Sequence, residues 1–473
     1  MDISIFGNLG LIAIFIPLIF GLYLLFLRMN KTYVPKKVLN WGASVANLIS
    51  LMVFSFSYFF IPDGEILNKS FSFFSIEKFS LELGFLIDGT NLIFLVFASL
   101  LSFLVALYSG VYFTKKKQFI FTKQRFYAFL SILSSFVYLF LASINLLQGM
   151  IILILQSIAI LVFSYFDIFK NPTNYNITRF HRIAHIGNFS LLVGALVLFK
   201  YAILSQGYIS SNSLNYDEFN LLVSYMYGIS SSFEFKFMVF AFLLAIYSRL
   251  AIFPLSCYYS FFANSSNILY LSVISIANNL VGLFLFLKIL PLIKMLDAYI
   301  LAFEIFLVFG IVASIFQILF ERNIKIIVGY LTSALNAGFI ILFLNFDINL
   351  IIPIYFGINL LFLSILMILF FVDKVNFKKR LINKQLGFIL EKMHIVFFEK
   401  MPQRLSSLLE ILDEKIIQNI LCFIIKMFDI FASIFVQKIT KANGIKSTRN
   451  ILIIFAIIAL FAIFIALFGG FKC

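Results

Sequence analysis

The sequence predicts an all-α polytopic membrane protein, and three observations support this prediction. Apolar residues make up 62% of the 473 positions, whereas charged residues make up only 12%. The mean hydropathy is +1.06, so a water-soluble fold would have too little polar surface to cover its core. The apolar residues also gather into runs of about twenty, which is the length that an α-helix needs to cross a bilayer.

These runs give about twelve predicted transmembrane helices. The first run is too long for the apolar core of a cleaved signal, and no basic residue precedes it, so we expect it to remain as the first span. The predicted spans cover residues 5–27, 38–61, 84–112, 126–147, 149–168, 183–203, 235–255, 266–290, 299–320, 325–345, 349–372 and 450–470.

Basic residues indicate how these spans are oriented. The formal net charge is +15, and lysine and arginine cluster after odd-numbered spans, for example at 113–125 and 373–384. Basic loops stay on the cytoplasmic or matrix side. We therefore expect both termini on the outer side of a bacterial cytoplasmic membrane or a mitochondrial inner membrane. The charge reflects orientation in the lipid bilayer, so no nucleic-acid partner is expected.

The segment between the last two spans has a different pattern. Apolar residues recur at helical spacing from Leu408 to Phe435, yet charged residues such as Asp413 and Lys426 are interspersed. This pattern is typical of an amphipathic helix on the membrane surface, acting either as a lipid anchor or as a brace across other spans or a neighbouring subunit. The predicted domains are a transmembrane bundle at 1–373, a cytoplasmic-side lateral helix region at 374–448 and a terminal transmembrane helix at 449–473.

No motif for catalysis or cofactor binding occurs in the sequence. Nucleotide-binding loops, zinc motifs and nucleophile elbows are lacking, and Cys257, Cys422 and Cys473 show no paired spacing. We expect no metal or other cofactor and no active site on this chain. Its place in any enzyme would be that of a non-catalytic membrane subunit.

Arg249 is a permanent positive charge inside an apolar run that ends at Pro254. A charge at membrane depth is costly and marks an ion path or a buried pair. A proline there breaks the helix and frees carbonyls that protein or water must satisfy. Snorkelling toward the membrane boundary explains Arg249 about equally well. The other charges in apolar runs, Asp88, Lys288 and Glu304, fall near predicted outer ends, where Asp88 is expected to lie in water.

Several segments, in order, resemble the proton-translocating, antiporter-like membrane subunits of respiratory complex I. They are GFLIDGTN at 84–91, LYSGVY at 107–112, RLAIFP at 249–254, NIKIIVGY at 323–330 and TSALNAGF at 332–339. The amphipathic segment followed by one terminal span is similar to the largest of these subunits, subunit L, and not to its two smaller relatives. The resemblance extends over about residues 4–471, although the chain is shorter than subunit L by about three spans.

The resemblance implies a mechanism in which buried lysines, a glutamate and histidines pass protons across the membrane, driven by redox chemistry elsewhere in the complex. The family's fifth-span glutamate corresponds to Gln156 and its partner lysine to Arg249, so Arg249 is expected to face Gln156. The arginine and aspartate of the sixth span correspond to His185 and Asn188. An amide and a guanidinium cannot exchange protons near neutral pH.

Two further positions of the channel are also replaced by apolar residues. The family's eighth-span histidine corresponds to Ile274, and the lysine of the second half-channel corresponds to Leu363. The resemblance therefore implies a membrane-arm subunit of a complex I-like NADH:quinone oxidoreductase, with other membrane subunits as partners. Its proton channel is expected to be degenerate and its role structural.

Two alternatives remain at this point. In the first, the chain is an active proton- or cation-translocating subunit of a multisubunit antiporter, hydrogenase-type or inorganic-carbon uptake complex, and His185 is a relay. Otherwise, it is an unrelated secondary transporter with a substrate pocket at the broken helix.

Overall fold

The computed structural model describes a helical bundle and one β-hairpin, which together lie within the first of two compact units, Met1–Arg380 and Leu381–Cys473. Among the described residues, eight helices are long and apolar enough to cross a membrane. The predicted class, a polytopic helical membrane protein, is confirmed. The described residues are 3–30, 32, 34–60, 67–76, 79–115, 120–168, 174–205, 215–216, 219–252, 255, 268–320, 324–346 and 351–359.

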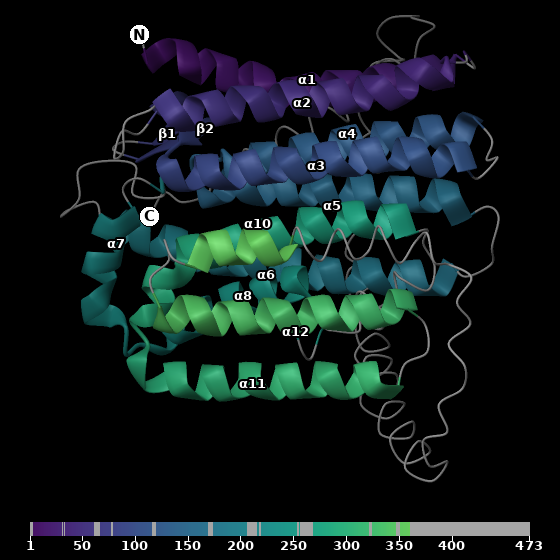
Figure 1. Ribbon diagram of the computed structural model, residues 1–473. Helices are drawn as coiled ribbons and strands as arrows, with labels where there is room; N and C mark the ends of the chain where they lie inside the picture. Colours follow the sequence, from purple (N-terminus) through teal and green to yellow (C-terminus); the bar gives the residue numbers. More distant parts are fainter. Residues whose placement is uncertain are drawn as a thin grey trace, which may run out of the picture. The chain divides into compact units, whose positions relative to one another are not determined.

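Long helices occur at the predicted spans and lie alongside one another (Figure 1). Residues 351–359 are also helical and begin the predicted span 349–372. The predicted amphipathic helix and the last span, 450–470, lie outside the described residues. The long helices are α1 (Ile3–Met29), α2 (Lys36–Phe60), α3 (Gly89–Lys115), α4 (Ile120–Leu141), α5 (Leu146–Ile168), α6 (Asn174–Ser205), α8 (Phe233–Leu250), α10 (Ile268–Lys294), α11 (Asp297–Phe320) and α12 (Ile324–Asn345).

A β-hairpin precedes α3 and was not predicted. Strands β1 (Leu67–Ile76) and β2 (Phe79–Ile87) pair antiparallel, and the register joins Ile76 to Phe79, so that two residues separate the strands. Serine and phenylalanine alternate in part of β1, a period of two that favours a strand over a helix. The start of the predicted span 84–112 is therefore strand rather than helix.

Hydrogen bonds attach the hairpin to the segment between α4 and α5 and to α5 itself, and the same segment also binds Tyr216. The Leu86 N–H donates to the Ala142 carbonyl at 2.9 Å, and the Tyr216 N–H donates to the Ile144 carbonyl at 2.9 Å. The Gln148 amide donates to the Gly84 carbonyl at 2.8 Å and accepts from the Gly84 N–H at 3.1 Å. The short helix α7 (Phe219–Met226) lies at the same end of the bundle, which we call the hairpin end (Figure 1).

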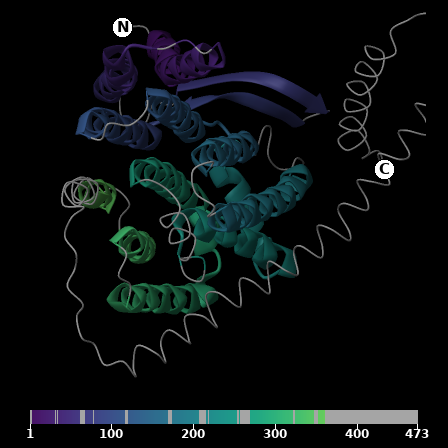
Figure 2. The same cartoon turned by 90° about the vertical axis from the view of Figure 1, so that its right-hand side faces the viewer.

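Helix α10 is at the centre of the bundle, and α11 is at its edge. In the membrane-length window of α10, 83% of residues are buried, against 17% in that of α11. Helix α10 contacts α3, α4, α8 and α12, whereas α11 contacts mainly α12. Figure 2 shows these helices end-on, with α1 and α2 on the far side from α11. Residues on α10 are therefore well placed to join the two parts of the bundle.

Candidate functional site

Helix α8 ends inside the bundle, and Arg249 lies in its last turn. The helix stops at Leu250, and Ala251 takes a left-handed conformation with φ of 52°. Its N–H donates to the Tyr247 carbonyl, which closes the helix end. The predicted break is thus present in this stretch and begins before Pro254, which lies outside the described residues.

The Arg249 side chain is only 2% exposed and is held by neutral acceptors from three helices. We call its partners Leu153, Ser157, Asn188 and Asn278 the Arg249 cage. Nη2 donates to the Leu153 carbonyl at 3.3 Å, to Ser157 Oγ at 3.2 Å and to Asn188 Oδ1. Nη1 donates to Asn278 Oδ1 at 3.3 Å. The charge lies within the bundle rather than at its surface, so snorkelling does not describe it.

Two glycines allow helix α8 to approach its neighbours closely enough to build the cage. A Cβ atom on Gly187 of α6 would lie 1.7 Å from Ser248 Oγ and 2.7 Å from Ser248 Cβ. A Cβ atom on Gly282 of α10 would lie 3.1 Å from the Cβ of Arg249. Small residues at such crossings let membrane helices pack at short range. The position of Arg249 is therefore fixed by backbone packing as well as by hydrogen bonds.

The carbonyl freed at the end of α8 has an amide partner that the sequence did not predict. Asn336 of α12 donates through Nδ2 to the Leu250 carbonyl at 2.8 Å and to Asn279 Oδ1 at 3.1 Å. A helix broken at membrane depth requires such a donor, because an unsatisfied carbonyl there is costly. Asn336 lies within the stretch TSALNAGF, but only the structure relates it to the break.

The other predicted channel positions do not all join this site. Gln156 is fully buried, but its amide makes no hydrogen bond in the described structure, and the neighbouring Ser157 contacts Arg249 instead. His185 lies on the exposed side of α6. Ile274 is buried in the apolar interior, and Leu363 lies outside the described residues. Arg249 was expected to face Gln156, but its hydrogen bonds go to Ser157 and Asn188 instead.

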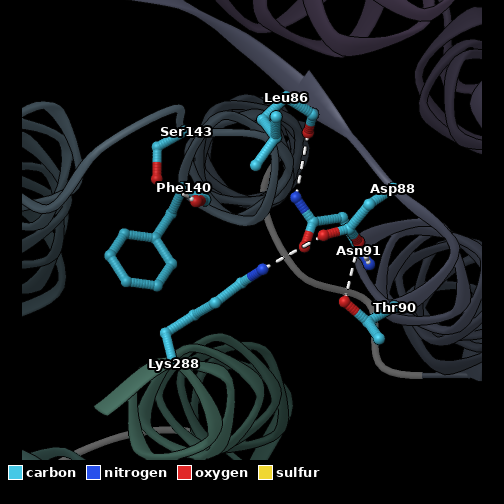
Figure 3. Close-up of polar contacts among 7 residues, drawn as sticks. All are labelled: Leu86, Asp88, Thr90, Asn91, Phe140, Ser143 and Lys288. Atoms are coloured by element: carbon cyan, nitrogen blue, oxygen red, sulfur yellow. Dashed lines mark hydrogen bonds and ion pairs between the residues drawn. The ribbon is translucent and has the colours of Figure 1, made fainter. Parts of the chain in front are cut away.

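A second charged site joins the start of α3 to α10 at the hairpin end (Figure 3). Asp88 Oδ1 accepts hydrogen bonds from the Asn91 N–H at 2.6 Å and from Thr90 Oγ1 at 2.7 Å. Asp88 thereby satisfies one free N–H group of the first turn of α3. Its Oδ2 lies 3.2 Å from Lys288 Nζ. The Lys288 ammonium also lies over the rings of Tyr216 and Phe284, at 5.3 and 5.2 Å.

This ion pair is partly buried, with 23% of the Asp88 and 17% of the Lys288 side chain exposed. Burial alone would raise the pKa of Asp88, but the Lys288 charge and the hydrogen bonds outweigh it and lower that pKa below its usual 3.8. The expectation that Asp88 lies in water was therefore wrong. Glu304, by contrast, lies at an exposed position, where its Oε1 accepts a hydrogen bond from Asn345 Nδ2 at 2.7 Å.

Comparisons with known proteins agree with the fold described above. Residues 73–127 match the model of the family described as NADH-Ubiquinone oxidoreductase (complex I), chain 5 N-terminus. The fold is similar to that of a chain in the structure "Respiratory complex I from Thermus thermophilus with bound NADH", with a TM-score of 0.54 and 15% identity. The resemblance to the antiporter-like subunits is confirmed. No curated protein sequence matches the chain significantly.

The structural match covers 70% of this chain and 63% of the Thermus chain. The chain thus spans less than two thirds of the length of that relative. At 15% identity this similarity shows the fold alone. Among the described residues, no three His, Cys, Asp or Glu side chains gather as metal ligands would.

Proposed function

We propose that this chain is an antiporter-like membrane-arm subunit of a complex I-type NADH:quinone oxidoreductase, with a structural role and a degenerate proton channel. The observation that carries this proposal is the Arg249 cage. A guanidinium occupies the broken helix, and a hydroxyl, a carbonyl and two amides hold it. The similarity of fold and the family match at 73–127 support the choice of complex.

A proton path needs groups that change protonation near the working pH. Arginine stays protonated in proteins, and none of the four cage partners titrates in this range. Ile274, at the position of the family's histidine, is 0% exposed in an apolar interior. Proton transfer through these groups is therefore not supported by their chemistry.

A structural role agrees with the wide apolar faces of the bundle. Helix α11 exposes large apolar side chains along its length, and in a membrane these contact lipid or neighbouring subunits. We expect the hairpin end to lie on the outer side and the chain's partners to be other membrane subunits. The exposed apolar residues of α11 include Tyr299, Leu301, Ile305, Phe309 and Val312.

One observation favours the alternative of active proton or cation translocation. His185 lies on α6 one turn before Asn188, which binds Arg249, and its side chain is exposed rather than packed inside the bundle. A histidine can both accept and release protons near neutral pH. In that case, His185 would relay protons past a fixed charge.

Replacing His185 by glutamine tests the two functions. Glutamine keeps hydrogen-bonding capacity but cannot titrate, so a structural subunit should retain its complex's proton uptake per electron transferred. The measurement uses the purified complex in liposomes, with Phe189→Leu as a control at a neighbouring exposed position. A loss of coupled proton uptake in His185→Gln alone, with assembly and electron transfer intact, would refute the structural role and support translocation.

A further inference from the structure

Neutral polar side chains from α5, α6, α10 and α12 lie around the end of α8, and we call them the polar run. Asn188 Nδ2 donates to Ser157 Oγ at 3.0 Å, and both contact Arg249. On the far side, Asn336 bonds to Asn279 and to the Leu250 carbonyl. The polar run thus comprises two hydrogen-bonded groups, one that joins α5, α6 and α10 to Arg249 and one that joins α10 and α12 to the end of α8. Polar groups inside a membrane bundle stabilise water and small cations unless an electrostatic barrier opposes them.

Gln156 provides a separate indication that this region binds water. Its side chain is 0% exposed, and neither its amide nitrogen nor its amide oxygen makes a hydrogen bond. Buried amides are normally satisfied, and a polar site of this kind recruits water. Gln156 lies on α5 in the same turn as Leu153 and Ser157, which bind Arg249. The unsatisfied Gln156 amide and the Arg249 cage therefore lie together, and water bound here would supply the hydrogen bonds that Gln156 lacks.

We infer that Arg249 is an electrostatic barrier that excludes hydronium and small metal cations from this polar run. This inference rests on the proposed function, because a tight membrane is needed where an antiporter-like bundle no longer pumps. A unit charge repels another strongly at short distance in a low-dielectric interior. The barrier makes Arg249 a specificity-determining residue rather than a relay.

Arginine suits a barrier better than the lysine that the family resemblance implies at this position. A buried lysine can release its proton and then neither repels cations nor remains inert. The guanidinium keeps its charge, and its two terminal nitrogens are bound on different helices. Gly282 lets α10 pack directly against the Cβ of Arg249. These contacts keep the charge on the polar run and prevent it from swinging toward solvent.

Passive proton entry into liposomes tests the barrier. The purified complex containing the full chain is reconstituted without redox substrate, a potassium diffusion potential is imposed with valinomycin, and an internal pH dye reports proton entry. We expect Arg249→Gln to raise the entry rate about tenfold over wild type. Lys200→Gln is the matched control, because it removes an exposed cation of α6 with 55% of its side chain accessible, and it should not change the rate.

Arg249→Lys supplies a second measurement with its own signature. Its proton entry should stay near the wild-type rate at about pH 6 and rise several-fold by about pH 9, because a lysine can lose its charge. If Arg249→Gln assembles and leaks no more than wild type, the barrier is refuted. If Arg249→Gln does not assemble, Arg249→Lys decides: a rate that rises with pH beyond wild type supports the barrier, and one that follows wild type refutes it.

The two experiments separate the two conclusions. Passive leak is measured without turnover, whereas the His185→Gln test follows proton uptake driven by electron transfer. An unchanged leak in Arg249→Gln together with unchanged coupled uptake in His185→Gln would leave the structural role in place and remove only the barrier. A loss of coupled uptake in His185→Gln would remove the structural role itself.

Discussion

The bundle holds two cations in opposite ways, one at its centre and one at its hairpin end. Arg249 is 2% exposed and is held by neutral amide, hydroxyl and carbonyl oxygens. Lys288 is partly exposed and lies 3.2 Å from a carboxylate, Asp88. The ion pair is therefore at the edge of the bundle and partly exposed. The centre holds a charge that cannot be removed by deprotonation near neutral pH.

The difference suggests that close helix packing positions the side chains at the centre, whereas an ion pair positions those at the edge. At the centre, helices approach through Gly187 and Gly282, and Asn336 binds a freed carbonyl. At the edge, one ion pair and two aromatic rings surround a single ammonium group. The effects of substitutions on the free energy of unfolding should therefore differ between the two places in size and in dependence on pH.

The largest effect is expected at the crossing of α6 and α8. Gly187→Ala places a Cβ atom within 2.7 Å of Ser248 Cβ, so the helices must separate and the cage must open. Overpacking of this kind costs about 3 kcal/mol of unfolding free energy. Denaturant unfolding of the detergent-solubilised protein measures it. Gly338→Ala is the control, because nothing lies within 4 Å of its added Cβ; equal losses in both variants would contradict a centre positioned by close helix packing.

A smaller effect is expected from Asn336→Ala on α12. The Leu250 carbonyl loses the donor that lies 2.8 Å away, and a buried acceptor left unsatisfied costs about 2 kcal/mol. The same unfolding measurement applies, and the loss should not depend on pH. Asn345→Ala removes an exposed amide from the same helix and should have little effect. If Asn345→Ala destabilises as much, the amide at the helix break has no special role.

The smallest effect is expected from the Asp88–Lys288 pair. A double-mutant cycle with Asp88→Asn and Lys288→Met should give a coupling of about 1 kcal/mol, as is usual for partly exposed ion pairs. Because the pKa of Asp88 is lowered in the fold, its contribution is present above its usual 3.8 and is lost as pH falls through the lower folded value. Coupling that is constant from about pH 5 to about pH 8 and fades in stronger acid would confirm this; coupling that fades near neutrality would not.

The location of the central site could be predicted from sequence, but its contacts could not. An arginine inside an apolar run that ends in proline indicates a broken helix within a bundle, and the structure ends α8 at Leu250. The partner on α5 was predicted one residue away from where it lies. Successive helix positions differ by about 100°, so Ser157 contacts Arg249 while the adjacent Gln156 does not bond to it. No local pattern sets the rotation of α5 this finely.

The hairpin end was harder to predict because its contacts join distant parts of the chain. Asp88 and Lys288 are 200 positions apart, and each was expected separately near a membrane boundary. Only packing of α10 against α3 brings them together. The β-hairpin carried a local signal, the alternation of serine and phenylalanine in β1. That signal was not used, and the predicted span that begins at residue 84 took in the end of β2.

The separation of these contacts along the chain also limits when the hairpin end can form them during synthesis. Glu82 meets Asn215 across 133 positions, and Asp88 meets Lys288 across 200. During synthesis the hairpin emerges early, but its partners emerge only after α6 and α10. Closing such long loops is entropically costly and slow. The hairpin end, although near the start of the chain, can therefore complete its native contacts only after Asn215 and Lys288 have been synthesised.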